Sequence, residues 1–310
     1  MRIVSLSAGA TEIVHALGLG EYLVGRSHQC DYPSQVESLA ICTDPRDITG
    51  VARTDIDEWV RDVVRETGSL HALRGDLIGS LHPTHVITQA QPGEEAIARD
   101  SIEQAVSDTI DSHPKVVVIE PRSLGGIETA IRRVAAACGL ERQGRELVES
   151  LRVRLGEIAP AAWASGIKPT VACIEWQQPL VAAGYWIPEL VEMAGATNLF
   201  SKAGEPSVLV TLDELAEADP EVILMMTHEG DMCQVRSQMR LVEEDPRWTS
   251  LRAVQTDRVV LVYGNQHFSR PSPRIVDTLW ILCEILHPEV FQPTLAGIAW
   301  ERYSPDTQAC

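Results

Sequence analysis

Histidines recur at one kind of place in this sequence, directly after a short, apolar, strand-like run. Three of the nine histidines share this position: His28 after Leu23–Ser27, His228 after Val222–Thr227, and His267 after Val259–Tyr263. Ligands of open α/β sheets bind at the carboxyl ends of the strands. A neutral imidazole there can coordinate a metal ion or hydrogen-bond a ligand. The pattern marks these histidines as candidate ligand-binding residues, although chance placement also explains it.

The first of these loops carries further reactive groups. It reads HQCDYPS, so His28 is followed by Cys30, Asp31 and Tyr32. A histidine with a cysteine two residues on can bind a soft metal. The same pair can act as a nucleophile with its base, although no third orienting group is evident. A polar loop with a Tyr-Pro turn explains the residues equally well.

Aromatic residues are scarce but clustered. Trp176, Tyr185 and Trp186 lie within eleven residues, and Phe268 follows His267. Flat aromatic faces at a cleft suit a large planar ligand, whereas ordinary core packing is the alternative. Gly184 precedes the Tyr-Trp pair, and its lack of a side chain would let the backbone approach a ligand closely.

Composition excludes several classes of function. The 310 residues hold 26 basic and 44 acidic side chains, a net charge of −18, which argues against a nucleic-acid binder. No apolar run reaches the roughly 18 residues of a membrane span. The motifs GxGxxG, GxxxxGK[ST], GxSxG and HExxH are absent.

Cysteines and the amino terminus bear on the compartment. Seven scattered cysteines with no CxxC pair predict buried free thiols in a reducing environment. The start MRIVSLSAGATEIV shows no long apolar segment or cleavage site of a signal peptide. If Met1 is the native start, a cytoplasmic location is expected; if the chain was trimmed, a periplasmic one.

Strand-like runs alternate with helical segments in two series, which predicts an α/β fold with parallel sheets. The expected strands are Arg2–Leu6, Leu23–Ser27, His85–Gln89, Lys115–Glu120, Thr170–Glu175, Val222–Thr227 and Val259–Tyr263. The helices include Ala10–Leu17, Ile187–Ala194, Leu212–Ala218 and Pro271–Leu286. Between the series, Leu147, Leu151, Leu155 and Ile158 have helical spacing. We expect two Rossmann-like lobes, 1–138 and 167–290, a connecting helix within 139–166, and a tail over 291–310.

Taken together, six segments resemble one known family. They are RIVSLSAGATEIVHALGLG, LVGRSHQCDYPSQV, IEPRSLGGIETAIRRV, VACIEWQQPLVAAGYWIPELVEMAGATNLF, LDELAEADPEVIL and VYGNQHFSRPSPRIVD. The chain resembles the cobalamin-binding branch of the helical-backbone, class III, periplasmic-binding-protein-like family, the substrate-binding proteins of ABC importers. The resemblance covers residues 2–291 and is closest to the short, leaderless members.

The resemblance implies non-enzymatic binding of a corrinoid such as cobalamin, in a cleft between two lobes joined by a helix over about Glu141–Ala164. The residues that it maps onto the ligand are Asp31, Tyr32, Trp176, Tyr185, Trp186, Gln266, His267, Phe268 and Arg270. It implies an ABC importer permease as partner, with Glu192 as a docking carboxylate. We add the hypothesis that His28, His228 or His267 is an axial cobalt ligand.

Two loops depart from the family pattern and leave the ligand open. Gln89–Gly93 has no cysteine where relatives carry a cysteine-rich segment, and Thr227–Asp231 replaces a Pro-Cys-Gly turn. Haem or a siderophore is therefore an alternative ligand. A metal-ion site that adds Asp231 to the three histidines, and an enzyme that uses Cys30 and His28, are further alternatives.

Overall fold

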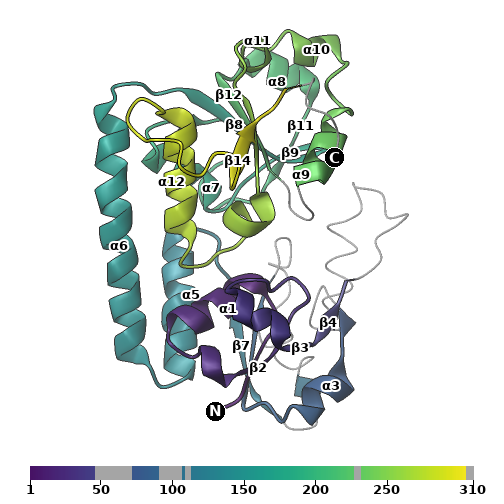
Figure 1. Ribbon diagram of the computed structural model, residues 1–310, viewed down its shortest axis with the longest axis vertical. Coiled ribbons are helices and arrows are strands. Elements are labelled where there is room, and N and C mark those ends of the chain that lie inside the picture. Colours follow the sequence, from purple (N-terminus) through teal and green to yellow (C-terminus); the bar gives the residue numbers. More distant parts are fainter. Residues whose placement is uncertain (46–71, 91–106, 109–112, 227–231, 305–310) are drawn as a thin grey trace. The chain divides into compact units, whose positions relative to one another are not determined.

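The computed structural model describes residues 1–45, 72–90, 107–108, 113–226 and 232–304 (Figure 1). The chain forms two compact units. Unit 1 comprises Met1–Pro121 and Gly125–Ser150, and unit 2 comprises Arg122–Leu124 and Leu151–Cys310. The long helix α6 contributes residues to both.

Unit 1 is built on a parallel sheet in the order β3-β2-β1-β6-β7. Its strands are β1 (Ile3–Ser5), β2 (Leu23–Arg26), β3 (Ala40–Ile41), β6 (His85–Gln89) and β7 (Lys115–Ile119). Strands β4 (Thr43–Asp44) and β5 (Ala72–Leu73) form a separate, two-stranded antiparallel sheet. Both strands come between β3 and β6 in the sequence. The helical elements are α1 (Ala8–Ala16), η1 (Gly20–Tyr22), η2 (Ser34–Ser38), α3 (Gly75–Ser80) and α5 (Leu124–Ala137). The predicted parallel sheet is confirmed here.

The strand order of unit 1 reverses at β1. The chain runs from β1 to β2 and β3 on one side and then continues with β6 and β7 on the other. Such a reversal is where ligands of open α/β sheets bind, outside the carboxyl ends of the strands. Ser7, just after β1, caps α1 by accepting a hydrogen bond from the Ala10 N–H at 3.3 Å. Apolar strand residues such as Val4, Val86 and Val118 are fully buried in its core.

Unit 2 has a mixed sheet in the order β11-β9-β8-β12-β13-β14, with β10 also paired to β8. Its strands are β8 (Thr170–Gln177), β9 (Leu180–Ala182), β10 (Thr197–Asn198), β11 (Val208–Val210), β12 (Val222–Met226), β13 (Val259–Val262) and β14 (Trp300–Arg302). The predicted strands β8, β12 and β13 are parallel neighbours. The antiparallel strands β9, β11 and β14 were not foreseen.

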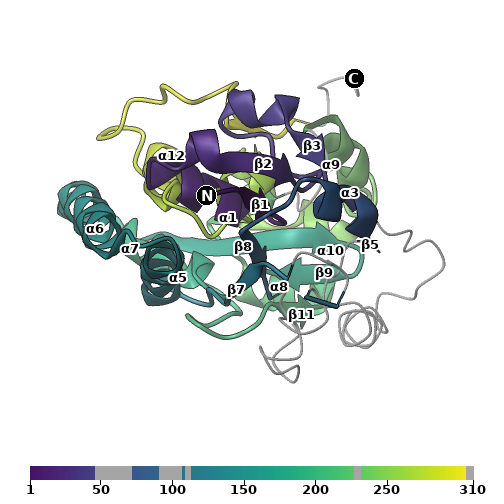
Figure 2. The same ribbon diagram turned by 90° about the horizontal axis from the view of Figure 1, so that it is seen from below.

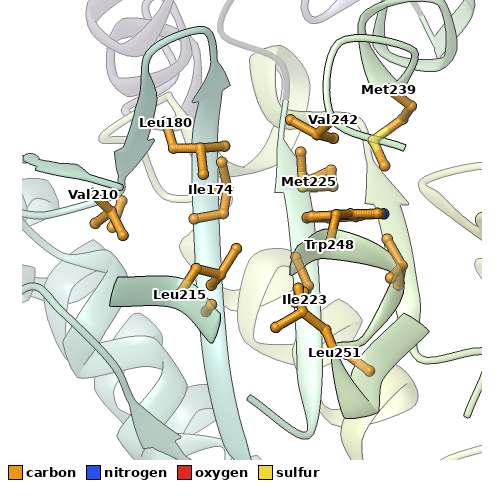
Figure 3. Close-up of a cluster of buried hydrophobic side chains, with 14 of the residues drawn as sticks. Ile174, Leu180, Val210, Leu215, Ile223, Met225, Met239, Val242, Trp248 and Leu251 are labelled. Carbon is orange, nitrogen blue, oxygen red and sulfur yellow. The ribbon is translucent and has the colours of Figure 1, made fainter. Parts of the chain in front are cut away.

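One cluster of buried hydrophobic side chains in unit 2 lies on one face of this sheet (Figure 3). The helical elements of the unit are α7 (Ile187–Met193), α8 (Leu212–Ala218), α9 (Met232–Met239), α10 (Pro246–Thr249), α11 (Arg252–Gln255), η5 (Gly264–Phe268) and α12 (Ile275–Leu286). Ile174 of β8 and Met225 of β12 are fully buried, and Trp248 of α10 is packed in the same cluster. Burying each large apolar side chain stabilises the fold by about 1.5–3 kcal/mol.

The long helix predicted between the two series is α6 (Glu141–Ala164). Leu151, Leu155 and Ile158 are buried on one side of it, as the spacing predicted, whereas Leu147 is half-buried and Val148 is buried instead. In unit 1, α5 lies beside the first part of α6 (Figures 1 and 2). A side chain at Gly144 would meet the Ala135 Cβ at 2.5 Å, so the close packing of these helices requires glycine.

The carboxyl-terminal region of unit 2 differs from the expectation in two ways. Helix α12 begins at Ile275 rather than Pro271, because residues that precede a proline disfavour helical geometry and Pro273 follows Pro271 closely. The expected tail over 291–310 contains β14, which pairs with β13. Buried Glu284 of α12 accepts hydrogen bonds from the Trp300 indole at 2.9 Å and the Thr294 N–H at 3.0 Å.

The cysteines require one correction. Five of those that the structure describes are free and buried, as expected: Cys30, Cys42, Cys138, Cys173 and Cys283. Cys233 of α9 is disulfide-bonded instead. Sequence spacing could not reveal it, because bonded cysteines need only be close in space. Within the described ranges, no helix is long and apolar enough to cross a membrane.

Candidate functional site

The first candidate segment is the loop from Ser27 to Pro33 in unit 1, which starts where β2 ends. A buried arginine, Arg26, holds it. The Arg26 guanidinium donates to the carbonyl oxygens of Ser27 at 3.1 Å and Cys30 at 2.9 Å. It also donates to the Glu37 carbonyl at 3.1 Å, beyond the loop. One charged side chain thus fixes both ends of the turn that carries the candidate residues.

His28 is tied to a threonine on β4. Its backbone N–H donates to the Thr43 Oγ1 at 3.0 Å, and its ring Nδ1 lies 2.8 Å from the same oxygen. Thr43 is fully buried and its hydroxyl donates to the Ser27 Oγ at 3.2 Å. Both the backbone and the ring of His28 are therefore oriented by one side chain.

Cys30 lies beneath the loop, with an exposed fraction of 1%. Its Sγ is 3.0 Å from the Thr11 Oγ1, which in turn is 2.8 Å from the Ser5 Oγ. The structure thus pairs Cys30 with Thr11 and His28 with Thr43. A nucleophilic thiol must be reachable, so the burial of Cys30 gives the Cys30–His28 alternative no support.

The tip of the loop carries the groups nearest to solvent. Asp31 is half-buried and Tyr32 is 46% exposed. An exposed aromatic ring at the carboxyl edge of a parallel sheet is available for stacking against a planar ligand. The role of Tyr32 as a ligand contact stays a prediction.

The second candidate segment lies in unit 2, where β9 leads into α7. Tyr185 has a positive φ of 55°, and its N–H donates to the Glu205 carbonyl at 2.7 Å. A Cβ on Gly184 would lie 2.4 Å from that same carbonyl oxygen. Gly184 was expected to admit a ligand, but the close approach is made by the chain's own backbone at Glu205–Pro206. Its smallness serves the fold of unit 2.

The turn before α12 contacts this second segment. Residues Gly264–Phe268 form a π-helical turn, a geometry frequent at functional sites. The Trp186 indole N–H donates to the Phe268 carbonyl at 3.0 Å, and the Thr278 hydroxyl donates to the His267 carbonyl. The Tyr185 and Trp186 rings lie with centroids 6.2 Å apart. A hydrogen bond thus joins two segments of unit 2 that are some eighty residues apart in the sequence.

The polar residues of this turn differ in exposure. Gln266 is exposed, His267 is half-buried and Arg270 is buried. The His267 Nδ1 lies 3.3 Å from a guanidinium nitrogen of Arg274. This arginine also forms an ion pair with Asp277, the nitrogen and oxygen being 3.6 Å apart.

Three candidates remain: Trp176, His228 and Asp231. Trp176 is half-buried on β8, and its indole donates to the Gln178 carbonyl at 3.0 Å in the turn to β9. His228 and Asp231 lie outside the described residues. In the part of the chain that the structure covers, no group of three or more His, Cys, Asp or Glu side chains is placed to hold a metal ion.

Sequence reasoning missed the residues that hold the candidates in place: Arg26, Thr43, Arg274 and Thr278. Arg26 had a detectable signal, since a charged residue ends an otherwise apolar strand. Thr43 had none, because it lies fifteen positions from His28. Glu192, the suggested docking carboxylate, is exposed on α7, and its carbonyl accepts a hydrogen bond from the Trp163 indole at 3.2 Å.

Comparison with known proteins agrees with this architecture. A family model described as periplasmic binding protein matches residues 3–264. The vitamin B12-binding protein of Vibrio cholerae serotype O1 is 24% identical over 293 residues, 92% of this chain and 88% of that protein.

Solved structures show the same fold. The vitamin B12-binding protein BtuF of Vibrio cholerae superposes with a TM-score of 0.64 at 21% identity, over 94% of this chain and 98% of that one. The heme-binding protein RhuT of Roseiflexus sp. RS-1 gives 0.69 at 21% identity, over 93% and 98%. Because the family model matches most of its length, the chain belongs to the periplasmic binding protein family.

Proposed function

We propose that this protein binds a corrinoid, without chemical turnover, as the substrate-binding component of an ABC transport system. Solute binding follows from its family. The observation that carries the corrinoid proposal is the hydrogen bond from the Trp186 indole to the Phe268 carbonyl. It joins the GYW segment to the turn before α12, and both were assigned to the ligand from sequence.

The chemistry of the candidate residues suits such a ligand. A corrinoid has a broad apolar ring and a rim of amides, so it needs aromatic surface and groups that hydrogen-bond amides. Tyr32 offers an exposed ring, and Gln266 an exposed amide. The vitamin B12-binding proteins among the relatives support the same ligand class.

Haem is a second candidate, because a structure of the same fold is that of a heme-binding protein. Its porphyrin presents a flat face that would stack on the same aromatic rings. Unlike a corrinoid, it has carboxylate groups at its rim instead of amides, so the polar contacts must differ.

Absorbance titration of the purified protein with cobinamide, cobalamin and haem separates these ligands. We expect saturable spectral changes with a corrinoid and none with haem. Saturable changes with haem alone would identify haem as the ligand instead of a corrinoid. No response to any of the three compounds would overturn the proposal that the protein binds a corrinoid.

Tyr32→Ala tests the loop. We expect about tenfold weaker corrinoid binding, equal to about 1.4 kcal/mol, with a stability change within about 0.5 kcal/mol. Tyr22→Ala is the matched control, since Tyr22 is 44% exposed in the same unit but precedes β2 instead of following it. Equal affinities of the two variants would contradict a role for Tyr32.

The partner and the location are parts of the same proposal. An exposed carboxylate on α7, Glu192, would dock on the permease, so Glu192→Gln should weaken transporter binding and leave ligand affinity unchanged. The expected cytoplasmic location stays a prediction, which cell fractionation checks. The disulfide at Cys233 bears on the same question, because disulfides persist chiefly in oxidising compartments such as the periplasm.

A further inference from the structure

Trp163, near the carboxyl end of α6 in unit 2, is the most exposed aromatic side chain of the described residues. It is 65% exposed, whereas Trp280, the next most exposed tryptophan in those ranges, is 36% exposed. Tryptophan is highly buried on average in folded proteins, so this ring differs from the rule. Ile167, in the turn that follows α6, is 49% exposed and adds apolar surface close by in the chain.

The Trp163 ring is held in place despite its exposure. Its indole N–H lies 3.2 Å from the Glu192 carbonyl oxygen and 3.1 Å from that of Met193, both in the last turn of α7. A Cβ on Gly195, just beyond that helix, would lie 3.2 Å from the ring Cδ1. The polar edge of the indole is therefore satisfied inside unit 2, and its apolar surface is presented to solvent in a fixed position.

A buried histidine joins the same two helix ends. The His287 Nε2 lies 2.7 Å from the Ala194 carbonyl oxygen, and its Nδ1 lies 3.1 Å from the Ser165 Oγ. Ala194 directly follows α7, Ser165 directly follows α6, and His287 is fully buried. The ends of the two helices thus form one connected surface, and a surface that is ordered beforehand loses little conformational entropy when it binds.

A carboxylate lies next to this ring in the fold. Glu192 is exposed, and its own carbonyl is one of the two acceptors of the Trp163 indole. The chain carries a net charge of −18, which attracts a basic partner at long range. In protein interfaces, buried tryptophan side chains supply much of the affinity, whereas charged groups at the rim mainly speed and orient the encounter.

We propose that Trp163 is the apolar anchor by which unit 2 docks on the permease of an ABC transporter, with Glu192 as the charged group beside it. The permease would offer an apolar recess to the indole and a basic side chain to the carboxylate. That the partner is a permease rests on the proposed function. Trp163 supplies the larger part of the affinity, because its ring leaves water when it enters the recess.

The affinity of the cobinamide-loaded protein for the ABC importer of the organism that produces this chain, held in lipid nanodiscs, tests the proposal. Trp163→Ala should raise the dissociation constant about thirtyfold. Glu192→Gln should raise it about fivefold, and less at high salt. Leu209→Ala is the matched control, since Leu209 is 64% exposed on β11 of the same unit. Equal affinities of Trp163→Ala and Leu209→Ala would overturn the proposal.

Two further measurements separate docking from folding. Trp163→Phe keeps an aromatic ring but loses both hydrogen bonds, so its transporter affinity should lie between those of the native protein and Trp163→Ala. Cobinamide titration and urea unfolding of both variants should match the native protein. If Trp163→Ala loses cobinamide binding in proportion to transporter binding, the residue is structural and the proposal fails.

Lys168→Gln tests the sign of the partner's charge. Lys168 is exposed and directly follows Ile167, so a basic partner surface predicts no loss of transporter affinity. A loss as large as that of Glu192→Gln would overturn the basic partner. If the native protein binds cobinamide but not the importer, the docking proposal fails and corrinoid binding stands. If it binds neither, the proposed function fails and the docking surface with it.

Discussion

The two candidate ligand segments are held by different kinds of interaction. The loop of unit 1 is fixed by buried polar groups, Arg26 and Thr43, which bond to its backbone and to His28. The turn of unit 2 is fixed by an aromatic ring, Trp186, which is itself buried and adds one hydrogen bond. The loop leaves Tyr32 exposed, whereas the turn buries Phe268.

This difference predicts which substitutions destabilise each segment. A polar anchor leaves unsatisfied buried groups when one partner is removed, although little volume is lost. An aromatic anchor loses packing over a large area, and its hydrogen bond is the smaller part. Substitutions that remove volume should therefore harm unit 2 most, and substitutions that remove donors should harm unit 1 most.

The largest effect is expected at Trp186. Trp186→Ala should lower the free energy of unfolding by about 3–5 kcal/mol, because a large buried side chain is replaced by a cavity. Trp186→Phe keeps most of the ring and loses the indole N–H, so it should cost about 1 kcal/mol. Urea unfolding measures both. Equal losses in the two variants would show that the hydrogen bond, rather than packing, holds the turn.

A smaller loss is expected at Arg26. Arg26→Met retains most of the buried volume but removes one donor from each of three carbonyl oxygens, and we expect a loss of about 2–4 kcal/mol. Arg26→Lys keeps the charge but not the planar guanidinium, so its loss of stability should lie between zero and that of Arg26→Met. Cobinamide titration should show weaker binding for both. A methionine variant as stable as the native protein would remove the contrast between the two segments.

The smallest expected effect is a loss of stability at alkaline pH. It arises from buried thiols, of which each unit holds at least one with a raised pKa. Burial raises the pKa of the Cys42 thiol in unit 1 to about 11, and that of Cys173 in unit 2 to about 12, from 9.0. A raised thiol pKa means that stability is complete below pH 9 and is lost as pH rises toward the folded value.

Urea unfolding of the native protein and of Cys42→Ala between pH 8 and 11 measures this contribution. We expect the native protein to lose on the order of 2 kcal/mol more than the variant across that range. Parallel pH profiles would show that Cys42 ionises as readily in the folded chain as in the unfolded one.

The sequence predicted what depends on local pattern. Strands such as β6 and β12 were recognisable because buried parallel strands are continuous apolar runs. Helix α6 was recognisable from its helical spacing. Thr43 and Arg274 were not, since a hydrogen-bond partner is chosen by tertiary packing. Gly184 was recognised as a point of close approach, but the approaching partner is a distant part of the chain.

The same limit applies to the candidate site. Residue types indicated where a ligand would be bound, and family resemblance supplied the ligand class. Neither could reveal that Thr43 lies against His28 or that Arg274 lies against His267. Strand β14 was missed for a related reason: its pairing with β13 is supported by Glu284, which binds the Trp300 indole from α12.

The buried thiols offer a practical route to an optical reporter. Thiolates, not thiols, react with maleimides, and burial keeps Cys42 and Cys173 protonated at neutral pH, as it does Cys283 with a pKa of about 12. A Tyr32→Cys substitution would place a thiol at an exposed position. A fluorophore attached there would respond to a ligand in a chain that is otherwise unchanged, with no need to replace the five buried free cysteines of the described ranges.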